Sequence, residues 1–410
     1  MTSEHLTVDV AVVGTGMVGL TLADLLSKQG KSIAVIDRNP IAEFEHDEEL
    51  SSRVTAVSPG SQAIFEHVGA WSAMQAKRVT PFQQMHVWDE ASGAPKNGSI
   101  HFDAAELQRA DLGHIVENRV IQTSLYEVLQ ADEKIHWLTP ASVENILQQE
   151  ECVEVFLDNG EIITTKLLVG ADGNRSAVRN LAEITFIEKS YQQLGLVALV
   201  ETEHSHQNTA WQRFLQTGPL ALLPLSNDKD NKQICSIVWS VSEDYADDLM
   251  KLNEHEFADA LSVASDMQLG NIVLRSKCAA FPLVSGQAEH MVQPRIALVG
   301  DAAHALHPLA GQGANLGFAD AAMLADVLDK SERDIGSYKV LRKYERARTG
   351  ETQVMQKAMD AFVSGFGSNH AGVVAARNYA LSAADSMRPV KKFFMRHAMG
   401  LSKDRPTYIQ

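Results

Sequence analysis

Apolar and polar positions alternate along the chain in patterns that separate strands from helices. Residues 7–13 (TVDVAVV) form an apolar run typical of a buried strand, and residues 17–29 place apolar side chains at helical spacing. A second apolar run follows at 32–37 (SIAVID). The succession of strand, helix and strand predicts a βαβ unit at the start of the chain.

Similar patterns cover most of the remaining sequence. Helices are expected over 58–68, 119–130 and 254–265. Strands are expected as several short runs within 135–170 and at 195–201, 219–225, 234–241 and 295–300. Because strands dominate from about 184 to 281, we expect a separate sheet-rich domain there, followed by a strand and a long helical region.

The turn between the first strand and the first helix carries glycines at dinucleotide-binding spacing. Gly14 would permit a tight turn, Gly16 would let backbone amides approach a pyrophosphate, and Gly19 would let the helix lie close to the strand. Asp37 ends the second strand, about where an acid that binds a ribose belongs. The alternative for Asp37 is a residue that only forms the turn. The segment indicates a dinucleotide, which can be NAD or FAD.

Two further strand-to-turn segments carry acidic residues. Residues 168–179 (LVGADGNRSAVR) place Asp172 after an apolar run, either beside a cofactor or as the cap of the next helix. Residues 300–304 (GDAAH) follow another strand, and Asp301 at its end could hold sugar hydroxyls. The glycine-rich stretch 311–315 (GQGAN) then opens a helix, whose N-terminus can stabilise a carbonyl that becomes anionic.

Composition and charge exclude several classes of protein. With 45% hydrophobic and 21% charged residues, the chain has the composition of a globular protein, and its length suggests two or three domains. A net charge of -16 argues against nucleic acid as a partner. The cysteines, Cys152, Cys235 and Cys278, lie far apart and give neither a disulfide framework nor a zinc site.

The N-terminus and the apolar runs bear on localisation. No basic leader precedes the first strand, and no apolar run approaches the ~18 residues that span a bilayer. We therefore expect a cytoplasmic protein, at most peripheral to the inner face of the membrane.

The glycine-rich segments together resemble those of a known enzyme family. The GTGMVG turn with Asp37, the GADG stretch and the stretch GDAAHALHPLAGQGANLGFAD resemble the class A FAD-dependent aromatic monooxygenases, and more narrowly the ubiquinone-biosynthesis hydroxylases. Further matching stretches are SSRVTAVSPGS, which contains Arg53, LGHIVENRVIQTSL, which contains Arg119, QRFLQTGPLALLPL and Phe281-Pro282-Leu283. The resemblance covers nearly the whole chain, although the family more often has Glu at the position of Asp37.

The resemblance implies a fold and a division into domains. The fold would be α/β, with a Rossmann-like FAD-binding domain as in para-hydroxybenzoate hydroxylase, an interleaved sheet-rich substrate domain and C-terminal helices. We expect the FAD-binding domain at 1–80, 105–183 and 285–345, the substrate domain at 81–104 and 184–284, and the C-terminal helical region at 346–410.

The resemblance also implies roles for individual residues. The residues expected to bind the cofactor are Gly14, Gly16, Met17, Val18, Gly19, Asp37, Arg38, Arg53, Arg119, Asp172, Asp301, Gly313, Ala314 and Asn315. Among these, the glycines of the first turn would hold the pyrophosphate, Asp37 the adenosine ribose and Asp301 the ribitol or pyrophosphate. The residues expected to border the reactive flavin ring are Pro308, Gly311, Gln312 and Gly313. No metal site is expected, because few carboxylates lie near His304 and His307 in the sequence.

The implied reaction is hydroxylation of the aromatic ring of a polyprenyl phenol. FAD would be bound tightly without a covalent bond, and NADH or NADPH would reduce it as a transient visitor. O2 would then form a flavin C4a-hydroperoxide that attacks the ring in a dry cavity. The alternatives are a hydroxylase of a small soluble aromatic, a flavin reductase of prenyl chains, a flavin-carrying scaffold of a biosynthetic complex and a degenerate fold without flavin.

A basic, aromatic segment near the C-terminus suggests a contact with another surface. Residues 388–405 (RPVKKFFMRHAMGLSKDR) could dock an acidic protein at anionic lipid, where a polyprenyl phenol resides, or could meet other ubiquinone-pathway proteins. The alternative is a helix whose aromatic face packs against the protein itself. A homo-oligomer is also compatible with the sequence.

Overall fold

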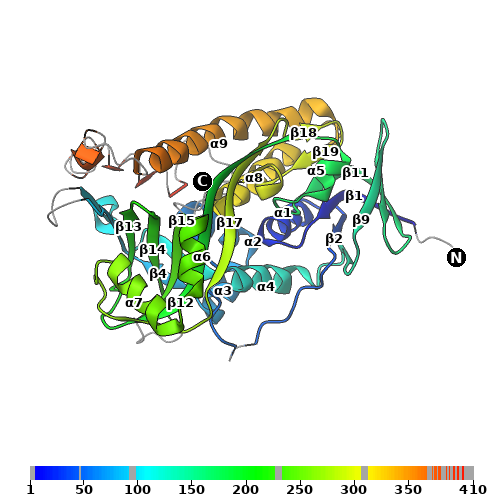
Figure 1. Ribbon diagram of the computed structural model, residues 1–410. Coiled ribbons are helices and arrows are strands. Elements are labelled where there is room, and N and C mark those ends of the chain that lie inside the picture. Colours follow the sequence, from blue (N-terminus) through cyan, green and yellow to red (C-terminus); the bar gives the residue numbers. More distant parts are fainter. Residues whose placement is uncertain are drawn as a thin grey trace.

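The computed structural model describes residues 5–45, 48–91, 98–226, 233–305 and 313–366, with residues 351 and 358–364 as backbone only. It also describes positions 372, 374–375, 377–379, 385, 387, 391–392, 395–396 and 399–400. The described strands form a mainly parallel sheet, a larger mainly antiparallel sheet and a small three-stranded sheet between them (Figure 1).

The mainly parallel sheet carries the start of the chain. Its strands are β1 (His5–Val13), β2 (Ile33–Ile36), β8 (Ile135–Leu138), β9 (Val143–Gln148), β10 (Val153–Leu157), β11 (Ile162–Gly170), β18 (Val292–Gln293) and β19 (Ile296–Leu298). The parallel strands follow the order β19-β11-β1-β2-β8, and β18, β9 and β10 are antiparallel to their neighbours. The parallel strands are apolar runs because they are covered on both faces.

Helices cover this sheet. They are α1 (Met17–Lys28), α2 (Pro59–Val68), α3 (Trp71–Lys77), α4 (Asn118–Leu129), α5 (Ala177–Leu181), α8 (Gly313–Asp329) and α9 (Tyr338–Phe366), with the 3-10 turn η2 (Gly300–Ala302). A second 3-10 turn, η1 (Ala104–Leu107), follows a strand of the antiparallel sheet. Helix α1 packs against α4 and α8, and its residues from Gly19 to Ser27 are all buried. An apolar helix surrounded in this way lies at the centre of the core.

The antiparallel sheet carries the middle of the chain. Its strands are β5 (Gln84–Asp89), β6 (Ser99–Asp103), β12 (Phe186–Thr202), β13 (Thr209–Leu215), β14 (Gly218–Leu225), β15 (Ile234–Ser242), β16 (Ile272–Leu274), β17 (Ala279–Ala288) and β20 (His304–Ala305). Their order is β20-β17-β12-β15-β14-β13-β5-β6, with β16 beside β12. Helices α6 (Glu243–Lys251) and α7 (Glu254–Ala264) pack on one face, against alternate side chains such as Leu196, Leu222 and Trp239.

The two large sheets are joined by short elements. The small sheet consists of β3 (Val54–Val57), β4 (Thr80–Phe82) and β7 (Gly113–Glu117), paired in the order β3-β7-β4. Strand β20 follows η2 directly and pairs with β17, so the chain passes from the end of β19 into the second sheet within a few residues. The end of β19 therefore lies where the two sheets meet.

The predicted α/β fold with a second, sheet-rich part is confirmed. The first βαβ unit and the helices expected over 58–68, 119–130 and 254–265 are present within two residues of their expected bounds. Helix α6 was not expected. The domain boundaries stay a prediction, although β5 and β6 share a sheet with β12–β17. No helix in the described part of the chain has both the length and the apolar character needed to cross a bilayer.

Candidate functional site

The turn after β1 approaches the end of β11 so closely that no side chain fits. Gly14 has a φ of +113°, and a Cβ atom on it would lie 2.4 Å from the carbonyl oxygen of Ala171. The Gly14 N–H donates to the carbonyl of Ile36 (2.8 Å), and the Ala171 N–H donates to the carbonyl of Val13 (2.8 Å). The first glycine of the motif is required because three adjacent strands meet here.

Of the next two glycines, Gly16 faces open space and Gly19 faces a packed neighbour. A Cβ atom on Gly19 would lie 2.1 Å from the Gly14 carbonyl oxygen, whereas a Cβ atom on Gly16 would meet nothing within 4 Å. Gly16 is also the N-cap of α1, which no described side chain caps and whose first turn has no acidic residue. The N–H groups of Met17 and Val18 are therefore available to an anion at the positive end of the helix.

Asp37, at the end of β2, fixes the shape of this turn. Its Oδ2 accepts from the N–H (2.8 Å) and the hydroxyl (2.9 Å) of Thr15, and its Oδ1 accepts from the N–H of Asn39 (2.9 Å). The remaining lone pairs of the carboxylate can accept from a ribose hydroxyl. Arg38 is exposed beside it. Gln122 of α4 donates to the Thr15 carbonyl (2.8 Å), a contact that nothing in the sequence pattern indicates.

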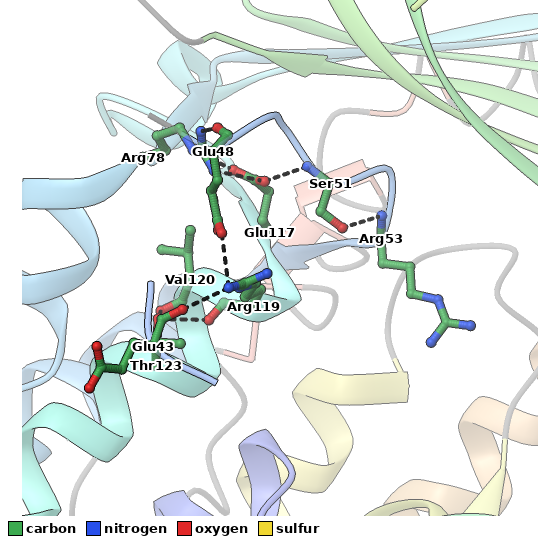
Figure 2. A network of polar contacts seen from close by, with 9 residues as sticks. All are labelled: Glu43, Glu48, Ser51, Arg53, Arg78, Glu117, Arg119, Val120 and Thr123. Atoms are coloured by element: carbon green, nitrogen blue, oxygen red, sulfur yellow. Dashed lines mark hydrogen bonds and ion pairs between the residues drawn. The ribbon is translucent and has the colours of Figure 1, made fainter. Parts of the chain in front are cut away.

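The two arginines assigned to the cofactor have different surroundings (Figure 2). Arg119, at the start of α4, donates to the carbonyl of Glu43 (2.7 Å), and its Nη2 lies 2.9 Å from Glu48 Oε2. Arg53, directly before β3, has an exposed side chain that points away from these glutamates. Its guanidinium has no partner among the described residues. Among the described residues Arg53 is thus an unpaired cation, whereas Arg119 is paired with the segment that follows β2.

Asp172 supports the helix that follows it. Its Oδ2 accepts from the N–H groups of Ala177 (2.6 Å) and Val178 (3.2 Å), and its Oδ1 accepts from the hydroxyl of Ser176. Ser176 is itself the N-cap of α5. These contacts favour the capping role that the sequence left open, and they hold the carboxylate at the end of β11.

Asp301 lies at the end of β19, on the same edge of the sheet. Its side chain is exposed at the surface, although the surrounding protein shields the carboxyl from part of the water and so raises its pKa. The charge of His304 opposes this rise, and that of Asp320 adds to it. Val18 packs beside it: a Cβ atom on Gly300 would lie 3.4 Å from Val18, and one on Gly317 would lie 2.6 Å from it. The start of α1 therefore packs directly on the third glycine-rich segment.

A buried ionic cluster holds the Gly300–Asp301 turn. Asp320 of α8 is fully buried, and its Oδ2 accepts from the N–H of Gly300 (3.0 Å) and lies 2.6 Å from His304 Nε2. Its Oδ1 accepts from Arg348 Nε of α9 (2.6 Å). Burial would raise the pKa of Asp320, but the charges and hydrogen bonds of His304 and Arg348 hold it below its usual value. The role of His304 is thus to pair with Asp320, and His307 lies outside the described residues.

The start of α8 contacts the turn that opens α2. Asn315 is buried, and its Oδ1 accepts from the Ser58 N–H (3.0 Å) and the Ser61 hydroxyl (2.7 Å), while its Nδ2 donates to the Ala56 carbonyl (2.8 Å). Gly313 and Ala314, the first residues of α8, are half-buried. Of the residues expected around the flavin ring, Pro308, Gly311 and Gln312 lie outside the described residues.

These segments meet because their strands are neighbours. The order β19-β11-β1-β2 places the carboxyl ends of four parallel strands side by side, and those ends carry Asp301, Asp172, the glycine turn and Asp37. In open α/β sheets, ligands bind outside this edge. The open space at Gly16, the uncapped start of α1 and the free guanidinium of Arg53 suit the diphosphate of FAD, and the two acids that reach solvent suit its sugar hydroxyls.

Comparisons with known proteins agree with this geometry. The FAD binding domain family matches residues 7–361. The 3-demethoxyubiquinol 3-hydroxylase of Escherichia coli K12 is 35% identical over 397 residues, 96% of this chain and 98% of that protein. The mitochondrial ubiquinone biosynthesis monooxygenase COQ6 of Danio rerio is 34% identical over 451 residues, 97% of this chain and 90% of that protein.

A solved structure extends the likeness to the fold. The p-nitrophenol 4-monooxygenase PnpA of Pseudomonas putida DLL-E4 superposes with a TM-score of 0.77 at 19% identity, covering 98% of this chain and 99% of that one.

Proposed function

This chain belongs to the FAD-dependent monooxygenases of ubiquinone biosynthesis, and we propose that it hydroxylates the aromatic ring of a polyprenyl phenol. The observation that carries the proposal is the meeting of the three glycine-rich segments at one edge of the parallel sheet, beside the junction with the second sheet. Bound FAD, reduced by NADH or NADPH, supplies activated oxygen for the reaction. The chain supplies binding, orientation and the exclusion of water.

Each part of the cofactor has a candidate partner. The diphosphate would lie against the N-terminus of α1 and near Arg53, where backbone N–H groups and a guanidinium favour anions. The adenosine ribose would lie at Asp37 and the ribityl chain at Asp301. The flavin ring would lie near Gly313, where the start of α8 can stabilise negative charge on the reduced ring.

One face of the antiparallel sheet supports a lipophilic substrate. Ala221, Leu223 and Val238 are half-buried and lie on the face opposite to α6 and α7, as their pairing shows. Ser236 shares this face, because it pairs with Leu223, and its hydroxyl donates to the carbonyl of Ser52 (2.8 Å). At Ser236 and Leu223 this face is packed against the segment that carries Arg53. A polyprenyl phenol would lie beside that contact, against Ala221 and Val238.

Substrate-dependent oxidation of NAD(P)H tests this proposal. The purified flavoprotein is given NADH or NADPH and O2 with a short-chain polyprenyl phenol in detergent, or with 4-hydroxybenzoate. We expect the polyprenyl phenol to stimulate oxidation and to gain one oxygen atom by mass spectrometry, whereas 4-hydroxybenzoate has little effect. Stimulation by 4-hydroxybenzoate alone would indicate a hydroxylase of small aromatics. Bound FAD without stimulation by either compound would indicate a scaffold.

We also propose a peripheral contact with the membrane, because a polyprenyl substrate resides in the bilayer. Within the described part of the C-terminal segment, Lys392 and Arg396 are exposed, whereas Lys391, Met395 and Met399 are buried. The contact would therefore use the exposed cations and anionic lipid, with the methionines packed against the protein.

A further inference from the structure

A buried glutamate beside Arg53 and Arg119 makes its hydrogen bonds away from the helix that it begins. Glu117 ends β7 and is the N-cap of α4, but its side chain makes no hydrogen bond to the helix that it caps. It is only 2% exposed. An acidic N-cap residue ordinarily accepts from the first turn of its own helix. The Glu117 carboxylate instead accepts from the N–H of Ser51 (2.6 Å), in the segment between β2 and β3.

Arg78, at the C-terminal end of α3, completes this contact (Figure 2). Its Nε lies 2.8 Å from Glu117 Oε2, and its Nη1 donates to the carbonyl of Glu48 (2.7 Å). The Glu48 carboxylate in turn lies 2.9 Å from Arg119 Nη2. The segment 48–51 is thus tied to α3 and α4 by three charged side chains. Such charge-assisted contacts are stronger than neutral ones, and the burial of Glu117 strengthens them further.

The same segment leads directly to Arg53. The Arg53 N–H donates to the Ser51 hydroxyl (3.2 Å), and its carbonyl accepts from the N–H of Asn118, the residue after Glu117 (3.0 Å). Strand β3 then begins, with Val54 paired to Glu117 across the small sheet. The backbone of Arg53 is therefore fixed on both sides by residues that Glu117 holds or adjoins, while its guanidinium stays free.

We propose that Glu117 is a positioning residue that acts through Arg53: by holding Ser51 and Arg78 it fixes the segment 48–53, so that the Arg53 guanidinium is presented to the diphosphate of FAD. This inference rests on the proposed function, because it takes the edge of the parallel sheet to be the FAD site. Arg119 secures the same segment from α4, through the Glu48 carboxylate and the Glu43 carbonyl. A guanidinium held in place loses less freedom when it binds an anion, and affinity rises accordingly.

A double-mutant cycle on FAD binding tests the coupling between Glu117 and Arg53. The apo-proteins of the full chain with Glu117→Gln, with Arg53→Met and with both changes are titrated with FAD, with quenching of flavin fluorescence as the readout. We expect each single change to weaken binding about 10- to 100-fold, the range for a hydrogen bond to a charged group. We expect the double variant to bind no more weakly than Arg53→Met alone, because Glu117 acts through Arg53.

A matched control separates this role from general stability. Glu127, also on α4, pairs with Lys77 of α3 (2.6 Å) but is exposed and does not touch the segment 48–53. Glu127→Gln should bind FAD like the unchanged chain. Melting temperatures of the apo-proteins identify any variant that fails to fold. If Glu117→Gln fails to fold, Arg78→Lys replaces it in the cycle. A lysine keeps the positive charge but cannot contact Glu48 and Glu117 at the same time, as the guanidinium of Arg78 does.

Several results would overturn the inference. They are unchanged FAD affinity in Glu117→Gln or in Arg53→Met, or a double variant weakened by the product of the two single factors. The proposed function fails separately, if the unchanged chain binds FAD but does not oxidise NAD(P)H in response to the phenol. The FAD titrations would still measure the coupling between Glu117 and Arg53 in that case.

Discussion

At the scale of single residues, buried carboxylates organise the surroundings of the site. Asp320 holds the Gly300 turn, and Glu117 holds the segment that leads to Arg53. The sequence indicated neither role. Asp320 lies within an apolar helix and Glu117 at the end of a strand, and an acid at either place can equally well be exposed to solvent. It did identify Asp37 and Asp301, because those two acids follow apolar runs that end at the edge of a parallel sheet.

Replacement of Asp320 should reveal its contribution to stability through pH. His304 and Arg348 lower the pKa of Asp320 in the folded state. The charged carboxylate therefore stabilises the fold fully at a pH above the pKa of an aspartate in the unfolded chain, about 4. This contribution to the free energy of unfolding is lost as pH falls from there through the lower pKa of the folded state. Asp320→Asn should destabilise the protein by about 3–5 kcal/mol at neutral pH, because the variant loses the buried ion pair between Asp320 and Arg348.

Denaturant unfolding from pH 7 to pH 3 measures this effect. The difference between the two proteins should shrink as pH falls below about 4, because the Asp320 carboxylate then becomes protonated in the unfolded state while it is still charged in the folded state. The other titratable groups near Asp320 are Asp301, His304 and Tyr344, and all of them are retained in the variant. A difference that stays constant down to pH 3 would contradict the role of the Asp320 charge.

At the scale of elements, strand ends and helix starts were predictable, and the C-terminal segment was not. Apolar runs and glycines fixed β1, α1, β11 and β19 within a few residues, because both signals are local. The aromatic and basic residues of 388–405 left a choice between docking and packing. Lys391 Nζ lies 2.7 Å from Glu106 Oε1 of η1, and Met395 and Met399 are buried beside Ala104. Such long-range contacts cannot be read from local periodicity.

The membrane proposal gives a prediction for this segment. Lys392→Glu combined with Arg396→Glu should reduce flotation of the full chain with liposomes that contain anionic phospholipid, by about 1 kcal/mol per cation. Liposomes of neutral phospholipid should show no such difference. The melting temperature should stay within a few degrees of the original, because both side chains are exposed. Equal flotation of the variant and the unchanged chain on anionic liposomes would contradict the proposal.

At the scale of the whole molecule, the strands form two large sheets (Figure 1). One carries the proposed cofactor edge, and the other carries the half-buried apolar residues Ala221, Leu223 and Val238. The sequence predicted this division, because strand patterns dominate from about 184 onward, and it also indicated that the segment 81–104 joins the second part. Among the contacts that join the two parts, β20 pairs with β17, and Ser236 donates to Ser52. Neither leaves a local pattern, because each joins segments far apart in the chain.

The central claim is that three glycine-rich segments form a single FAD site. It is tested most directly by titrating the apo-protein with FAD and measuring the stoichiometry, for the unchanged chain and for Asp301→Ala. The account predicts one FAD per chain, retained through gel filtration, and loss of stable retention in Asp301→Ala with little change in melting temperature, since that side chain reaches solvent. Unchanged flavin absorbance of Asp301→Ala after gel filtration would contradict it.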